Sequence, residues 1–224
     1  MVCFARSSLA MTQCVAARSP LTFHLSPFTS YLSPFTFHLM NLDERLFLWL
    51  NGLHADWLDP MMVAATDIRT WIPLYLLLLF LVFKHYRWRG FWVILGLALV
   101  VLCSDQLSAH VCKPLFHRLR PCHNPELEGL IHLPNGMAGG KYGFVSSHAA
   151  NTFAVATFIT AALRGRYRWV GWLVFGWAII SSYSRIYLGV HYPGDILAGA
   201  ALGAIIGLII WKLLRLILKN HLNC

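Results

Sequence analysis

Long apolar stretches separated by short polar segments dominate the chain from residue 61 onward. Each stretch approaches or reaches the ~20 residues that a helix needs to cross ~30 Å of hydrocarbon. The preceding segment, LDERLFLWLNGLHADWLDP (42–60), mixes apolar and charged residues and is typical of an amphipathic helix at a membrane surface. The pattern predicts an all-α, polytopic membrane helix bundle of about five to six transmembrane helices, with spans over roughly 61–83, 91–109, 148–163, 168–183 and 195–218.

The last span carries a regular series of small residues. Gly199, Gly203 and Gly207 recur at four-residue spacing and therefore share one helical face. Glycines on one face let a second helix approach closely in lipid. We expect another helix of the bundle to pack against this face.

The segment before these spans has a different pattern. Residues 19–39 read SPLTFHL, SPFTSYL and SPFTFHL, and a proline every seventh residue prevents a continuous helix. We expect residues 1–39 to be disordered or not part of the native protein, with Met40 as the true start; a transit or signal peptide is the alternative. Residues 40–224 would then form a single membrane-embedded domain.

Composition and charge agree with a membrane protein. The chain is 58% hydrophobic and 12% charged, against about 25% charged in soluble domains. The formal net charge is +9, but the basic residues form short clusters at 84–89, 164–168 and the C-terminal end, as cytoplasmic loops do, rather than a nucleic-acid patch. By alternation, loop 110–145 and the stretch 184–195 should both emerge on the opposite face, toward the periplasm or the outside.

Three stretches on that opposite face carry candidate chemistry: KPLFHRLRP (113–121), VSSHAANTF (145–153) and SRIYLGVHYPGD (184–195). They supply three cations whose geometry suits phosphate oxygens, Lys113, Arg120 and Arg185. Ser146 or Ser147 is a candidate N-cap, and the free N–H groups of a helix start would add donors for an anion.

Two histidines, His148 and His191, complete this set. Phosphoryl transfer without a metal needs one histidine to attack phosphorus and a second to protonate the departing oxygen. Asp195 can hold one imidazole by its ring N–H and so fix its tautomer. No Cys/His metal-ligand spacing occurs, so we expect no metal and no cofactor.

Several features leave alternatives open. Cys112 and Cys122 either pair across the polar loop or remain free thiols. Asp105, inside an apolar span, is a candidate partner of Lys113. An anion transporter or a non-catalytic scaffold is a different reading of the same charges. Transport usually distributes charges through the spans or uses an inverted repeat, whereas here the charges cluster at one surface.

The three stretches resemble the tripartite signature K-x6-RP, PSGH and SR-x5-H-x3-D of the type 2 phosphatidic acid phosphatase superfamily, which also includes the soluble vanadium haloperoxidases. Val145 and Ser147 replace the proline and glycine of the second motif, whereas its serine and histidine are kept. The first and third motifs are matched in full, by Lys113, Arg120 and Pro121 and by Ser184, Arg185, His191 and Asp195.

The resemblance implies a helical membrane lipid phosphatase in which His191 forms a phosphohistidine, His148 is the general acid and Asp195 orients His191. Phosphate would be held by Lys113, Arg120, Ser146, Ser147 and Arg185. Among substrates, polyprenyl diphosphate is the first choice, as in an undecaprenyl-diphosphatase. The alternatives are phosphatidylglycerol phosphate, phosphatidate and lipid A phosphates. The protein would reside in the inner (plasma) membrane, with membrane lipids as its other partners and the site facing the periplasm.

Overall fold

The computed structural model describes residues 41–136 and 139–220, and the expectations for segment 1–39 lie outside these ranges. Within them the chain is helical, and the pairing of Leu119 with Tyr142 is an isolated bridge rather than a strand. The prediction of an all-α bundle is therefore confirmed.

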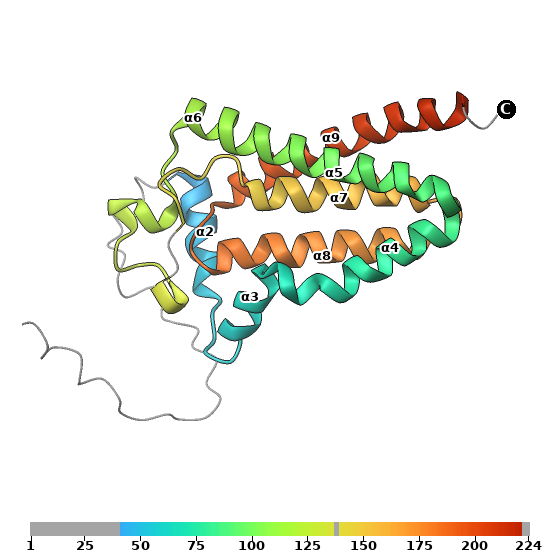
Figure 1. The fold of residues 1–224 in the computed structure, drawn as a ribbon. Helices are drawn as coiled ribbons and strands as arrows, with labels where there is room; N and C mark the ends of the chain where they lie inside the picture. Colours follow the sequence, from blue (N-terminus) through green and yellow to red (C-terminus); the bar gives the residue numbers. More distant parts are fainter. Residues whose placement is uncertain (1–40, 137–138, 221–224) are drawn as a thin grey trace, which may run out of the picture.

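Five long helices run alongside one another (Figure 1). The helix α7 lies at the centre and packs against α5, α8 and α9. Two stretches, Ile68–Phe116 and Pro193–Leu218, are long and apolar enough to cross a membrane. The long helices are α4 (Ile72–Tyr86), α5 (Gly90–Gln106), α7 (Ser147–Leu163), α8 (Arg168–Tyr187) and α9 (Pro193–Asn220).

The connections between these helices separate to the two ends of the bundle. Figure 1 shows the α4–α5 and α7–α8 connections, which carry the basic clusters, at one end. Loop 117–146 and the α8–α9 connection lie at the other end, together with the short helices α2 (Leu42–Gly52) and α6 (Lys113–Phe116). The three candidate stretches therefore meet at one end, opposite the basic loops.

The first predicted span differs from the structure. Helix α3 (Asp59–Thr66) ends at Asp67, whose backbone is extended and whose carboxylate accepts a hydrogen bond from the Arg69 N–H at 2.9 Å. A short 3-10 turn, Ile68–Trp71, then leads into α4, which has a proline in its first turn. The prediction of one helix over 61–83 was wrong because Asp67 caps a new turn within it. Likewise, the predicted helix over 42–60 is divided between α2 and α3.

Two other helices are longer than their apolar stretches. Helix α5 continues through a π-helical segment, Leu107–Cys112, into α6, so Lys113 lies on a helix and not in the predicted loop. Pro114 lacks the N–H that would continue an α-helical ladder, and the wider π-helical turn directly precedes it. Similarly, α8 extends to Tyr187 and includes Arg185. The end of an apolar stretch does not by itself end a helix. Helix α6 ends at His117, whose backbone is left-handed (φ 47°).

Loop 117–146 folds back on itself through backbone hydrogen bonds. The N–H of Arg120 donates to the Lys141 carbonyl at 3.1 Å, and the N–H of Gly143 donates to the Arg118 carbonyl at 2.9 Å. Of the two alternatives for Cys112 and Cys122, the structure shows free thiols (Cys103 is also free). The loop is therefore held by its backbone pairing rather than by a disulfide.

The glycine face of α9 packs directly on the backbone of α7, as the spacing predicted. A Cβ added at Gly199 or Gly207 would lie 2.5 Å from the carbonyl oxygen of Ser146 or Ala154, respectively. At Gly203 it would overlap the Ala150 carbonyl oxygen. These contacts are with backbone atoms, which cannot rotate away as a side chain can.

We expect Gly203→Ala to lower the free energy of unfolding by about 1–3 kcal/mol, because the helices must separate to admit a methyl group. The measurement is thermal unfolding of the purified protein in one detergent. The matched control is Gly176→Ala in α8, where no atom lies within 4 Å of the added Cβ. This control should be neutral or stabilising by up to about 1 kcal/mol. Equal shifts for both variants would contradict the tight α7–α9 contact.

Candidate active site

The turn between α8 and α9 holds His191 beside Asp195. Gly189 adopts φ +71°, which permits the tight turn, and the N–H groups of Val190 and His191 both donate to the Arg185 carbonyl at 3.1 and 3.3 Å. His191 Nδ1 lies 3.4 Å from Asp195 Oδ2, and both side chains are buried. A carboxylate at Nδ1 favours the tautomer with the proton there. Nε2 is then the ring nitrogen available to a substrate.

Burial controls the charge of this histidine. Removal from water lowers the pKa of His191 to about 4; the hydrogen bond to Asp195 raises it, and the nearby Arg120 and Arg185 lower it. The imidazole is therefore neutral at neutral pH. A neutral imidazole carries the lone pair that nucleophilic attack requires.

The start of α7 brings a second histidine to the same place. Ser146 is the N-cap of this helix, and its Oγ accepts from the Ala149 N–H at 3.4 Å. His148 Nε2 lies 2.8 Å from Ser181 Oγ on α8, and the ring interacts electrostatically with His191 and Arg185. Of the two candidate caps, Ser146 fills that position, which leaves Ser147 at the first helical residue.

The three predicted cations surround the histidines. Lys113 Nζ donates to Ser147 Oγ at 2.9 Å, Arg120 Nε donates to the Tyr142 carbonyl at 3.2 Å, and Arg185 Nη1 donates to Thr66 Oγ1 at 2.7 Å. The three interact electrostatically with one another, and none forms an ion pair with a carboxylate within residues 41–136 and 139–220. Mutually repelling cations gathered in one partly buried place form a strong site for a multiply charged anion.

The outer loop closes one side of this site. A Cβ added to Gly143 would lie 3.0 Å from Arg120 Cγ, 3.1 Å from Asp195 Oδ2 and 3.5 Å from His191 Nδ1. The loop backbone therefore lies directly against the histidine–carboxylate pair, and a side chain at this position would require Arg120 or Asp195 to shift by a few tenths of an ångström. Asp105 accepts a hydrogen bond from Asn151 at 3.3 Å and interacts electrostatically with Lys113. The structure thus brings this intramembrane carboxylate near the predicted partner.

Sequence reasoning missed two charged residues of the site, Arg118 and Asp43. Arg118 Nη1 donates to Asp195 Oδ1 at 2.8 Å, and its Nη2 donates to Asp43 Oδ2 at 2.6 Å. Spacing offered one signal for Arg118: it stands two residues before Arg120 and therefore on the same side of an extended segment. Nothing in the local pattern of 42–60 connects Asp43 with a site more than seventy residues away.

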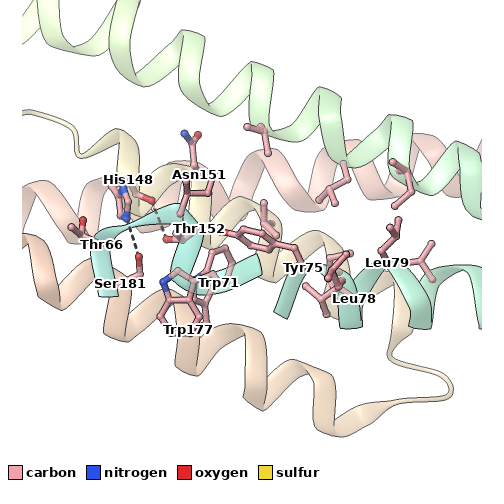
Figure 2. Close-up of a pocket in the computed structure, with 18 residues that line it drawn as sticks. Thr66, Trp71, Tyr75, Leu78, Leu79, His148, Asn151, Thr152, Trp177 and Ser181 are labelled. Carbon is pink, nitrogen blue, oxygen red and sulfur yellow. Dashed lines mark hydrogen bonds between the residues drawn. The ribbon is translucent and has the colours of Figure 1, made fainter. Parts of the chain in front are cut away.

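An apolar cavity of about 500 Å³ adjoins the site between α4, α5, α7 and α8. Figure 2 shows His148 and Ser181 at one end of this cavity and Leu78 and Leu79 toward the other. Aromatic side chains line the wall between them, Trp71, Tyr75 and Trp177. The cavity is therefore suited to an apolar chain that ends at His148. Within the described parts of the chain, no three His, Cys, Asp or Glu side chains are grouped to hold a metal ion.

Comparisons with known proteins agree with the geometry. Residues 89–218 match the model of the PAP2 superfamily. The chain is 39% identical over 168 residues to the lipid A 4'-phosphatase of Bacteroides thetaiotaomicron, which covers 74% of this chain and 73% of the relative. It is 31% identical to an undecaprenyl-diphosphatase of Sulfolobus acidocaldarius, over 60% of this chain and 58% of that relative.

The fold also matches a solved structure, that of Aquifex aeolicus LpxE. The TM-score is 0.55 at 27% identity, over 77% of this chain and 96% of that chain. The family model covers more than half of the chain and includes all three motif stretches. The helical bundle is therefore a shared fold, and the three stretches lie within the segment that the family model matches. The chain belongs to the PAP2 superfamily and is a membrane phosphatase that hydrolyses phosphate esters of lipids.

Proposed function

We propose that this phosphatase removes the phosphate of a lipid A-type glycolipid through a phosphohistidine on His191. The observation that supports the chemistry is the buried His191–Asp195 pair facing three cations that have no carboxylate partner in the described structure. The glycolipid is favoured by the lipid A 4'-phosphatase relative, which matches this chain at 39% identity. Polyprenyl diphosphate, the first choice from the sequence, becomes the second candidate, and the undecaprenyl-diphosphatase relative supports it.

In the first step, His191 Nε2 attacks phosphorus and the bond from phosphorus to the lipid oxygen breaks. His148 lies close to His191 and gives its proton to the departing oxygen. Asp195 accepts the Nδ1–H of His191 and stabilises the positive charge that develops on the ring. The lipid leaves as an alcohol, and phosphorus is bonded to nitrogen.

In the second step, water attacks the phosphohistidine. His148, which has given up its proton, now accepts one from the water as the oxygen–phosphorus bond forms. The phosphorus–nitrogen bond breaks, its electron pair returns to Nε2, and inorganic phosphate leaves. Both histidines are then ready for another cycle.

Lys113, Arg120 and Arg185 hold the non-bridging oxygens in both steps. Charge is spread over these oxygens in the transition state, so preorganised cations lower the barrier without reorganising at the moment of reaction. Ser146 holds the start of α7, whose backbone N–H groups add donors for an oxygen. Ser147 helps to position Lys113, whose Nζ donates a hydrogen bond to the Ser147 hydroxyl oxygen.

The cavity below His148 would hold part of the lipid tail. The polar end of the substrate then reaches the cations while its chain stays among the helices. We further propose that this end of the bundle faces the periplasm or the outside of an inner membrane. The basic loops at the opposite end support this orientation, because such loops remain in the cytoplasm.

We expect His191→Gln to lower turnover of a lipid phosphate by at least about a thousandfold, because the nucleophile is lost. His148→Gln should reduce turnover about 10²–10⁴-fold on the lipid. It should reduce the first step less on an aryl phosphate, whose leaving group departs without a proton. Rapid quench with ³²P-labelled substrate should then trap phosphoenzyme in His148→Gln and none in His191→Gln. Substantial turnover by His191→Gln would overturn the assignment of the nucleophile.

A panel of substrates tests the lipid. It comprises lipid A, undecaprenyl diphosphate, phosphatidate and phosphatidylglycerol phosphate, each in mixed micelles with EDTA present. We expect lipid A to have the highest kcat/KM, by at least about tenfold, and its 4'-phosphate to be the one removed, as shown by mass spectrometry. Vanadate should inhibit by imitating pentacoordinate phosphorus. A preference for undecaprenyl diphosphate would select the second candidate, and activity restored only by magnesium would contradict the mechanism.

Single cysteines test the orientation. In a background without the six native cysteines, Glu126→Cys lies in the loop at the site and Arg166→Cys in the basic α7–α8 loop; both positions are exposed. A membrane-impermeant maleimide added to intact spheroplasts should label Glu126→Cys and not Arg166→Cys. Lysed cells should label both. The opposite pattern in intact spheroplasts would place the site on the cytoplasmic face.

A further inference from the structure

Asp43, in the first turn of α2, contacts the active site although it lies outside the segment that the family model matches. Asp43 Oδ1 accepts from the Gly194 N–H at 2.8 Å, at the start of α9. Its Oδ2 accepts from Arg118 Nη2 at 2.6 Å. The family model begins at residue 89, so α2 lies outside it. Asp43 thus joins α2 to the helix start that carries the catalytic carboxylate.

Arg118 connects two carboxylates. Its Nη1 donates to Asp195 Oδ1 at 2.8 Å while Nη2 is bonded to Asp43. The guanidinium carbon also lies 4.2 Å from the centre of the Tyr192 ring, which fixes its plane. Both terminal nitrogens and the face are thus engaged by protein groups. This distinguishes Arg118 from Arg120, which has no carboxylate partner in the described structure.

The two oxygens of Asp195 have separate roles. Oδ2 accepts from the Tyr192 N–H at 3.1 Å and faces His191 Nδ1 at 3.4 Å, whereas Oδ1 accepts from Arg118. Asp195 is fully buried, so water does not readily replace a hydrogen-bond donor that its carboxylate loses. The bond from Arg118 therefore determines how the carboxylate is rotated. That rotation decides whether Oδ2 meets the imidazole.

We propose that Arg118 and Asp43 are positioning residues for catalysis: together they set the orientation and effective charge of Asp195, and through it the basicity of His191. This proposal rests on the proposed role of His191 as nucleophile. Arg118 alone would neutralise much of the charge on Asp195. Asp43 draws the guanidinium toward itself as well, so that Asp195 retains negative charge to stabilise the imidazolium.

The two residues should change the titration of His191 in opposite directions. Removing the cation of Arg118 leaves the negative charge of Asp195 unshared, which favours protonated His191. When the charge of Asp43 is removed, Arg118 interacts with Asp195 alone and neutralises more of its negative charge. The protonated form of His191 is then disfavoured. The other charged and titratable groups that act on His191 are Arg120 in loop 117–146, Arg185 on α8 and His148 on α7, and all three stay the same in both variants.

The experiment compares four variants of the full chain in one detergent: Arg118→Met, Arg118→Lys, Asp43→Asn and the double variant Arg118→Met/Asp43→Asn. We expect Arg118→Met to lower kcat about 100-fold, as a misdirected catalytic group does. KM and inhibition by inorganic phosphate should change little, because Arg118 does not hold the phosphate. Arg118→Lys should recover part of kcat, since it restores the charge but not the two-pronged geometry.

The pH dependence separates positioning from a merely structural role. The acid limb of kcat/KM, which reports the free enzyme, should move to higher pH in Arg118→Met and to lower pH in Asp43→Asn. Asp43→Asn retains an oxygen that can accept from the Gly194 N–H, so the start of α9 keeps its partner. The double variant should be no slower than Arg118→Met alone, because Asp43 acts through Arg118. Arg166→Met, in the exposed basic loop, is the control and should match the parent.

Two outcomes would overturn the inference. In the first, the parent enzyme is active and loses its activity in His191→Gln, but Arg118→Met and Asp43→Asn keep the kcat of the parent and the acid limb of its pH profile. The other is an increase in KM and in the inhibition constant of phosphate at unchanged kcat, which would make Arg118 a phosphate ligand. An active His191→Gln would instead refute the proposed function itself. A folding defect is recognised by the unfolding midpoint, and Arg118→Lys then still supplies the kcat and pH readouts.

Discussion

The close contact between α7 and α9 is the constraint on which the rest of the structure depends. Lipid provides no hydrophobic drive to bring helices together, so small residues that allow backbone approach determine which helices pair. Here the glycine face of α9 meets the Ser146, Ala150 and Ala154 carbonyls of α7. At the top of this contact, the N–H of Ser146 donates to the Asp195 carbonyl at 3.0 Å. The starts of both helices are therefore fixed to each other.

The geometry of the candidate site follows from that fixed pair of helix starts. His148 lies in the first turn of α7, and His191 directly precedes the first turn of α9. Neither helix can slide without separating the two imidazoles or bringing glycine backbone into collision with carbonyl oxygens. The three cations lie on other elements, namely α6, α8 and loop 117–146. They therefore add charge to a site whose position is determined by the contact between α7 and α9. Burial makes each of these charges effective because the surroundings screen them weakly.

The sequence predicted which side chains gather at one end of the bundle better than it predicted the path of the backbone. His148, His191, Asp195 and the three cations could be chosen as candidates because phosphate chemistry needs such side chains, and the alternation of spans predicted that they lie at one end. Helix ends were less predictable. Asp67 interrupts an apolar stretch, and the π-helical segment before Lys113 lies next to Pro114, which lacks the N–H of an α-helical ladder. Asp43 could not be identified at all, since its role depends on a contact with Arg118 that only the folded chain creates.

The cations and the apolar cavity lie on different sides of His148. On one side, in the function proposed above, the cations and Asp195 act on a group that every lipid phosphate shares. On the other, the cavity walls are apolar and come partly from α4 and α3, which precede the segment that the family model matches. Apolar walls discriminate weakly by themselves, because one methylene is worth only about 1–3 kcal/mol. If the cavity holds the lipid as proposed, selectivity between lipids depends on the shape of the cavity and on the polar groups that line it beside His148, such as Thr66 and Asn151.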